Sequence, residues 1–92
     1  MQIIYKYTLK IQDIQEIIMP VGAVILSAQM QNNEIVLWAG VDLSSNIEVI
    51  QFRIFGTGQP MPKINMQYIA TVQTHKERLV WHIFKCSTLL NT

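Results

Sequence analysis

The segment from Ala23 to Asp42 constrains the fold most, because two strand-like runs flank an Asn32-Asn33 pair. Asparagine tolerates the positive φ angles of a type I′ turn, which joins two antiparallel strands through a two-residue loop. With that loop, one face of the hairpin pairs only apolar residues: Met30 with Ile35, Ala28 with Leu37, Leu26 with Ala39 and Val24 with Val41. The other face pairs Gln31 with Glu34, Gln29 with Val36, Ser27 with Trp38 and Ile25 with Gly40. A slip of one residue would destroy this separation, so the sequence predicts both the hairpin and its register.

The first quarter of the chain repeats the pattern of short β-branched and aromatic runs between turn residues, which is typical of strands. We expect residues 3–11 and 14–19 to form a first hairpin that turns at Gln12-Asp13. Pro20 would end this hairpin, because proline donates no hydrogen bond to a strand ladder. Gly22 would then allow a sharp bend into the next strand.

The second half of the chain predicts three more strands. Residues 48–55 form one of them, with Ile50, Phe52 and Ile54 on one side, and residues 56–66 form a loop. Residues 67–75 and 79–86 are expected to pair around a turn at Lys76-Glu77. That register places Tyr68, Ala70 and Val72 on the face of Trp81 and Ile83. Helix signals are weak, and only the tail around Leu89-Leu90 suits a turn of helix.

Seven short strands with frequent turns predict an all-β chain, a compact small β-sandwich or barrel of about seven short antiparallel strands. A length of 92 residues fits a single β domain, residues 1–92. Only 14% of the residues are charged and half are hydrophobic, whereas about a quarter of a typical chain is charged. So few charges leave apolar surface with little to solvate it, and we therefore expect a homo-oligomer.

Several classes of partner are disfavoured by the charge pattern. The net charge is +1 and the basic residues are scattered, so no basic patch for long nucleic acid is visible. No apolar run approaches the roughly 18 residues of a membrane span, and the first residues lack the apolar stretch of a signal peptide. The single cysteine, Cys86, excludes an intrachain disulfide and suits a reducing cytoplasm.

The segment Phe-Arg-Ile-Phe-Gly-Thr-Gly-Gln-Pro at residues 52–60 ends a predicted strand in a glycine-rich loop. It is neither a dinucleotide fingerprint nor a P-loop, because no third glycine opens a helix and no Gly-Lys-Ser/Thr follows. Gly56, Thr57 and Gly58 could still present successive amides as an anion-binding nest. Arg53 could add a bidentate contact to phosphate. The commoner use of such a loop is a glycine bend between strands, with Arg53 on a solvated face.

No catalytic or metal-binding set emerges from the titratable residues. His82 and Cys86 are four positions apart on a predicted strand, or roughly 13 Å, which excludes a direct dyad. Thr71 is expected across from His82, so a hydrogen-bonded histidine is the simpler interpretation and a ligand-contacting histidine the alternative. Two histidines and one cysteine give no metal-ligand spacing. We therefore expect no catalytic residue, no metal and no cofactor.

Trp38 is expected on the less apolar face of its hairpin, opposite Ser27. Tryptophan in such a place caps a core, fills an interface or stacks on a base, and the first two uses are the commoner. Stacking of a base on Trp38 or Tyr68 requires one of them to lie near Arg53.

Nearly the whole chain, from Ile4 to Phe84, resembles a family of small uncharacterised proteins of bacteriophages and prophages. The matching pieces are Ile-Tyr-Lys-Tyr at 4–7, Met-Pro-Val-Gly-Ala at 19–23, Leu-Trp-Ala-Gly-Val-Asp at 37–42, the loop segment at 52–60, Tyr-Ile-Ala-Thr at 68–71 and Val-Trp-His-Ile-Phe at 80–84. Two departures are Ala70 in place of glycine and a charged turn at 76–78 in place of a glycine-rich one. The resemblance implies a phage accessory protein in the cytoplasm of the bacterial host, of the kind that antagonises host defence.

Some small phage proteins of that kind act as sponges for nucleotide immune signals. By analogy, the first hypothesis is a non-catalytic protein that sequesters a small nucleotide, such as a cyclic one, in pockets of a homo-oligomer. Its ligand-binding residues would be Trp38, Arg53, Gly56, Thr57, Gly58, Tyr68 and His82. The alternative is a module that docks on a host or phage protein without a small ligand. An enzyme is the least favoured class, because His82 would need a base from another strand.

Overall fold

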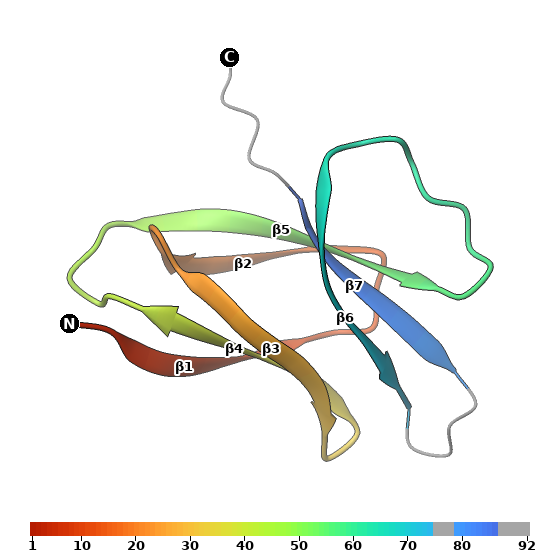
Figure 1. Ribbon diagram of the computed structural model, residues 1–92, viewed down its shortest axis with the longest axis horizontal. Helices are drawn as coiled ribbons and strands as arrows, with labels where there is room; N and C mark the ends of the chain where they lie inside the picture. Colours follow the sequence, from red (N-terminus) through yellow and green to blue (C-terminus); the bar gives the residue numbers. More distant parts are fainter. Residues whose placement is uncertain (75–78, 87–92) are drawn as a thin grey trace.

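A computed structural model describes residues 1–74 and 79–86, which form seven antiparallel strands in two sheets (Figure 1). The strands are β1 (Ile3–Leu9), β2 (Ile14–Pro20), β3 (Val24–Gln31), β4 (Glu34–Val41), β5 (Ile47–Gly56), β6 (Met66–Gln73) and β7 (Val80–Cys86). One sheet has the order β1-β4-β3 and the other the order β2-β5-β7-β6. The predicted all-β class is confirmed, and the two separate sheets make the architecture a sandwich. The described residues contain no helix that could span a membrane.

The hydrophobic core lies between the two sheets, on the faces that alternation along the strands turns inward. Its buried members are Leu9, Met19, Ala28, Ile35, Leu37, Ala39, Val41, Ile50, Phe52, Ile54, Val72 and Ile83. The predicted inward face of the fifth strand is confirmed, because Ile50, Phe52 and Ile54 are all buried. The central strands β4 and β5 supply most of this core. They therefore form the packed support from which the surface loops extend.

The hairpin of β3 and β4 turns at Asn32 and Asn33, whose φ angles of 51° and 66° confirm the predicted type I′ turn. Its register is also confirmed from the pair Gln31–Glu34 to the pair Ser27–Trp38.

Beyond Ser27 the predicted register of this hairpin is wrong. A β-bulge at Leu26 makes Ile25 the partner of Ala39 and Val24 the partner of Gly40. The extra residue re-aims the strand, so Ile25 packs against the core while Leu26 and Val24 are half exposed.

The predicted first hairpin is wrong, because β1 pairs with β4 and β2 pairs with β5. Residues 10–13 carry the chain from one sheet to the other instead of turning back within one sheet (Figure 1). The side chain of Gln15 holds this corner, since it accepts from the Lys10 amide at 2.8 Å and donates to the Lys10 carbonyl at 2.6 Å. Alternation identifies the buried face of a strand but not its partner, and both strands alternate correctly in either topology.

The bend between β2 and β3 is confirmed. Pro20 is the last residue of β2, and Gly22 has a φ of +82°. The Ala23 amide donates to the Pro20 carbonyl, which closes a tight turn around Val21 and Gly22.

The last predicted hairpin is confirmed as an antiparallel pair of β6 and β7, with Thr71 opposite His82 and Ala70 opposite Ile83. A bulge at Ile69 makes Tyr68 the partner of Phe84, so the prediction that Tyr68 shares the face of Ile83 is wrong. The bulge turns Tyr68 to the face that carries His82. The expected turn at Lys76-Glu77 and the expected helical turn at Leu89-Leu90 lie outside the described residues.

Candidate functional site

The outer face of the β2-β5-β7-β6 sheet carries a second, smaller group of packed side chains. Phe55 points away from the core and is nevertheless only 2% exposed. Its ring meets the ring of Phe84 edge-on at 5.8 Å, and the Phe84 ring meets that of Tyr68 at 5.6 Å. Cys86 lies buried on the same face of β7. We call Phe55, Phe84, Tyr68 and Cys86 the outer cluster.

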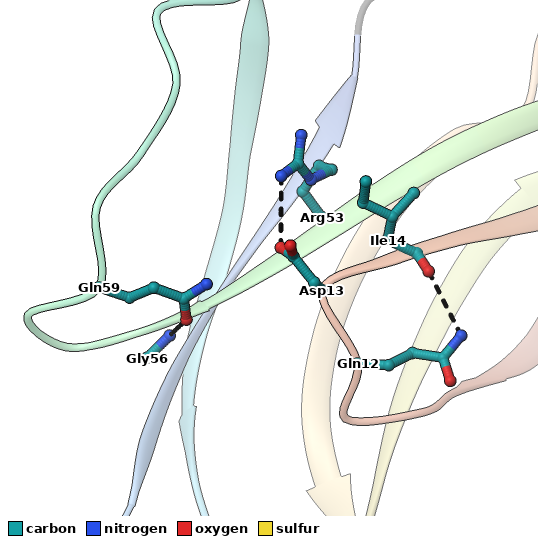
Figure 2. A network of polar contacts seen from close by, with 6 residues as sticks. All are labelled: Gln12, Asp13, Ile14, Arg53, Gly56 and Gln59. Carbon is teal, nitrogen blue, oxygen red and sulfur yellow. Dashed lines mark hydrogen bonds and ion pairs between the residues drawn. The ribbon is translucent and has the colours of Figure 1, made fainter.

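The glycine loop after β5 is a tight turn whose glycines have separate roles. The Gln59 amide donates to the Gly56 carbonyl at 3.0 Å, and Gly58 has a φ of +90°, which is the pattern of a type II turn. A Cβ at Gly56 would lie 3.3 Å from Cζ3 of Trp81. The Gly56 amide donates to Oε1 of Gln59 at 2.9 Å (Figure 2). The loop's own side chain therefore takes one of the amides that the sequence offered as an anion-binding nest.

Four side chains form a hydrogen-bonded chain across the end of this face. The Oγ1 atom of Thr57 lies 2.8 Å from Nε2 of His82, and Nδ1 of His82 lies 3.0 Å from Oγ1 of Thr71. The Thr71 hydroxyl in turn lies 2.7 Å from the hydroxyl of Tyr68. A neutral imidazole donates from one nitrogen and accepts at the other, and each hydroxyl can do either. The whole chain can therefore reverse its donors and acceptors to suit a bound group. We call these four residues the hydroxyl–imidazole chain.

An open hollow of about 270 Å³ lies beside this chain. It is lined by Phe55, Gly56, Thr57, Gly58, Gln59, Met61, His82 and Phe84. Its lining therefore combines the polar side chains of Thr57, Gln59 and His82 with the apolar side chains of Phe55, Met61 and Phe84. Pockets of this make-up, with few convergent polar groups over apolar surface, are typical of small-molecule sites.

Arg53 supports the outer cluster and is engaged in an ion pair. Its guanidinium carbon lies 5.2 Å from the centre of the Phe55 ring, and its Nη2 lies 3.3 Å from Oδ1 of Asp13 (Figure 2). The Arg53 side chain is only 13% exposed, and its buried Nε has no partner among the described residues. Burial raises the pKa of the Cys86 thiol, and the positive charge of Arg53 opposes that rise. Arg53 thus holds the cluster together from its β2 side.

Trp38 lies on the other sheet, between Lys6 of β1 and Ser27 of β3. This position is the outer face of the β1-β4-β3 sheet, because its neighbours Leu37 and Ala39 face the core. Trp38 and His82 therefore lie on opposite sides of the sandwich. The expected pairing of Trp38 with Ser27 is confirmed, but one copy of the chain does not bring Trp38 to the hollow.

Of the residues proposed from the sequence, Gly56, Thr57, Gly58 and His82 line one hollow. Tyr68 does not line it and reaches His82 only through the hydroxyl of Thr71. Sequence reasoning missed Phe55, Gln59, Met61 and Phe84 as lining residues and Asp13 as the partner of Arg53. The alternation of β7 places Phe84 on the face of His82 and could have revealed it. Nothing in the sequence links Asp13 to Arg53, since the contact depends on the crossing between sheets.

The described residues contain no group of three metal-ligating side chains. The site is therefore built from hydroxyls, one imidazole, backbone amides and aromatic rings.

A family model described as a domain of unknown function, DUF7352, matches residues 1–89. The match covers nearly the whole chain of 92 residues, so the protein belongs to this family. No curated protein and no solved structure matches the chain significantly.

Proposed function

We propose that this member of the DUF7352 family is a non-catalytic binding protein whose ligand lies in the hollow beside His82. The observation that carries the proposal is the hydroxyl–imidazole chain, whose members Thr57 and His82 line an open hollow. The apolar part of that lining comes from Phe55, Met61 and Phe84. A few convergent polar groups over aromatic surface suit a flat ligand with hydrogen-bonding edges.

A nucleobase is the flat ligand that these side chains fit best. An aromatic ring such as that of Phe84, which lines the hollow, can stack on any base, and base stacking contributes about 1–3 kcal/mol. The hydroxyl of Thr57 and the imidazole of His82 can each donate to or accept from a base edge. The ligand class is therefore a small nucleotide, linear or cyclic.

A phosphate on such a ligand would meet the loop rather than Arg53. The backbone of Thr57 and Gly58 borders the hollow, and amides at a tight glycine turn attract anions. Arg53 would act indirectly, because its ion pair with Asp13 and its contact with Phe55 hold the floor of the hollow in place.

Binding without turnover is favoured over catalysis by the partner of His82. The pair Thr57–His82 has the spacing of a nucleophile and its base. In catalytic triads the far side of the histidine meets a carboxylate, which stabilises the imidazolium that forms. Here that side meets the neutral hydroxyl of Thr71, which offers no such charge. We therefore assign the chain to recognition.

The resemblance to small phage proteins gives this binding a biological setting. Under the proposal, the protein acts in the cytoplasm of the bacterial host and sequesters a nucleotide signal of the host's defence. Its mode of action is stoichiometric, so its effect would scale with the amount of protein made.

The test is native mass spectrometry of the protein mixed with a panel of cyclic and linear nucleotides. We expect one nucleotide to remain bound with unchanged mass. Replacing Thr57 by valine or His82 by asparagine should weaken binding about tenfold each, since about 1.4 kcal/mol corresponds to a factor of ten. Gln29→Ala, on the outer face of the other sheet, is the matched control and should bind as the unaltered protein does. Retention of no nucleotide, or release of a chemically altered one, would refute the proposal.

A second candidate function is docking on a host or phage protein. It is favoured by Ile18 and Val49, which are directly opposite each other on β2 and β5 and are both more than half exposed. Ile47, opposite Pro20, extends this apolar strip at one end, whereas the pair Glu16–Gln51 interrupts it before Ile14. If docking is the function, Ile18→Lys should abolish the biological effect while nucleotide binding stays unchanged.

A further inference from the structure

The sheets of this sandwich end in four edge strands, and three of them are protected against pairing with another strand. β3 carries a bulge at Leu26, and β6 carries a bulge at Ile69. β2 ends in Pro20 and exposes Glu16 near its middle. Bulges, prolines and exposed charges are the devices that keep the edges of sheets from joining.

β1 has no bulge and no proline. It pairs with β4 without a break from Ile3–Val41 to Leu9–Ile35, so its free side is a regular edge. Its one charged residue is Lys6, whose ammonium donates to Oε1 of Gln31 on β3 at 3.0 Å. That bond draws the charge across β4 and away from the free edge. The backbone edge of β1 is therefore open to another strand.

The side chains at the start of this edge, Ile3 to Tyr5, are apolar on both faces. Ile3 and Tyr5 point to the core side of the sheet and are still 49% and 41% exposed, and Ile4 on the outer face is 62% exposed. Leu43, in the loop after β4, adds an exposed leucine and lines a hollow with Ile3. An edge that is both unprotected and flanked by apolar side chains is one that proteins normally cover.

We propose that a second copy of this chain covers the edge, with the two β1 strands antiparallel about a two-fold axis at Tyr5. In this register Tyr5 lies opposite Tyr5, Ile3 opposite Tyr7, and Ile4 opposite Lys6. Residues that face the core side in one copy then meet core-side residues of the other, because the pairing keeps the alternation in step. The two three-stranded sheets become one continuous sheet through an isologous interface.

The two-fold axis is placed at Tyr5 by charge and by exposure. An axis at Lys6 would set two ammonium groups directly opposite each other, which destabilises a strand pair. An axis at Tyr7 would set Tyr5 against the buried Leu9 and leave Ile3 and Ile4 outside the pair. The axis at Tyr5 covers the most exposed part of β1 and opposes no like charges. The inference is independent of the ligand at His82, which lies on the other sheet.

The first test is the mass of the protein in solution, measured by light scattering or sedimentation at micromolar concentration. We expect a dimer, and Tyr5→Lys should make it a monomer because it puts two ammonium groups at the axis. Gln67→Lys places the same charge on the edge strand β6 and should remain a dimer. A monomeric unaltered protein, or a dimer lost equally with Gln67→Lys, would overturn the proposal.

The register of the two β1 strands is tested by disulfide trapping in a Cys86→Ser background. This experiment also tests whether the dimer forms through β1 if Tyr5→Lys fails to fold. Paired residues of antiparallel strands have Cα atoms about 4.5–5.5 Å apart, within reach of a disulfide. Tyr5→Cys should therefore give a covalent dimer under mild oxidation. Two cysteines at position 6 would be roughly 8 Å apart in this register, so Lys6→Cys should not link. Linking by Lys6→Cys but not by Tyr5→Cys, or by neither, would overturn the assigned pairing.

Discussion

The outer faces of the two sheets differ in the side chains that pack on them. On the β2-β5-β7-β6 sheet, the chain after β5 turns at Gly56–Gln59 beside Phe55, which is buried although it points away from the core. On the β1-β4-β3 sheet, Trp38 lies between Lys6 and Ser27 and is only partly buried. The first face holds a network of hydroxyls and an imidazole. The second face buries Val36 beside Trp38 but has no such network among its described side chains. The difference teaches that a loop packed beside a sheet can build a second, smaller cluster and hold polar groups at its rim.

The largest expected loss of stability comes from Phe55→Ala, and Trp38→Ala is the variant to compare with it. Loss of a buried phenylalanine side chain costs about 3–5 kcal/mol, whereas Trp38 is partly exposed and should cost clearly less. Urea unfolding of both variants measures the two changes in the free energy of unfolding. Equal losses would mean that the two outer faces are packed alike.

A smaller effect is expected from Gly58→Ala, with Gly22→Ala as its matched control. Both glycines have a positive φ, +90° and +82°, and both are third in a four-residue turn. An alanine forced into this region costs about 1–2 kcal/mol, so both variants should lose similar stability in thermal unfolding. Only Gly58→Ala should also weaken nucleotide binding, because Gly58 lines the hollow. Equal binding by the two variants would separate the loop from the site.

Thr71→Val removes the middle of the hydroxyl–imidazole chain. It should lower the free energy of unfolding by about 1 kcal/mol, the usual net contribution of a hydrogen bond. In a domain of this size, that change lowers the melting temperature by about 4–8 °C. The ring nitrogens of His82 report the change directly, because Nδ1 loses its partner while Nε2 keeps Thr57. Nitrogen-15 shifts that move equally at both ring nitrogens would contradict the proposed arrangement.

The smallest effect concerns Cys86, whose raised pKa follows from burial in the outer cluster. A thiol with a raised pKa in the folded state stabilises the fold below its unfolded pKa. This contribution is lost as the pH rises through the folded value. We expect slow alkylation of the native protein near neutral pH, faster alkylation in denaturant, and a decline in stability above about pH 9, near the ordinary cysteine pKa. Alkylation as fast in the native state as in denaturant would show that the cluster is open.

Much of the fold follows from local sequence signals. The Asn32-Asn33 turn, the inward face of β5 and the pair Thr71–His82 were all predictable, because each depends on residues close together in the chain. The two bulges at Leu26 and Ile69 were not, since a bulge depends on how a strand fits its neighbours in three dimensions. The partners of β1 and β2 were missed for a similar reason. Alternation along a strand identifies its buried face but not the strand with which it pairs.

The candidate site was predictable only in part. Thr57 and His82 could be singled out by residue type, but their contact depends on the pairing of β5 with β7. Tyr68 reaches the site only because the bulge at Ile69 changes its face. Arg53 was expected as a phosphate contact, and its ion pair with Asp13 arises from the crossing between the sheets. Long-range geometry therefore decides which of the candidate residues act together.

The most direct test of the account is to map the nucleotide that binds by nuclear magnetic resonance, following backbone amides and the His82 ring during a titration. The account predicts that shifts concentrate at Thr57, Gly58, Thr71 and His82, with none at Ser27 or Trp38 on the opposite face. Shifts centred on Trp38, or no shift with any nucleotide of the panel, would contradict the claim that the hydroxyl–imidazole chain is the binding site.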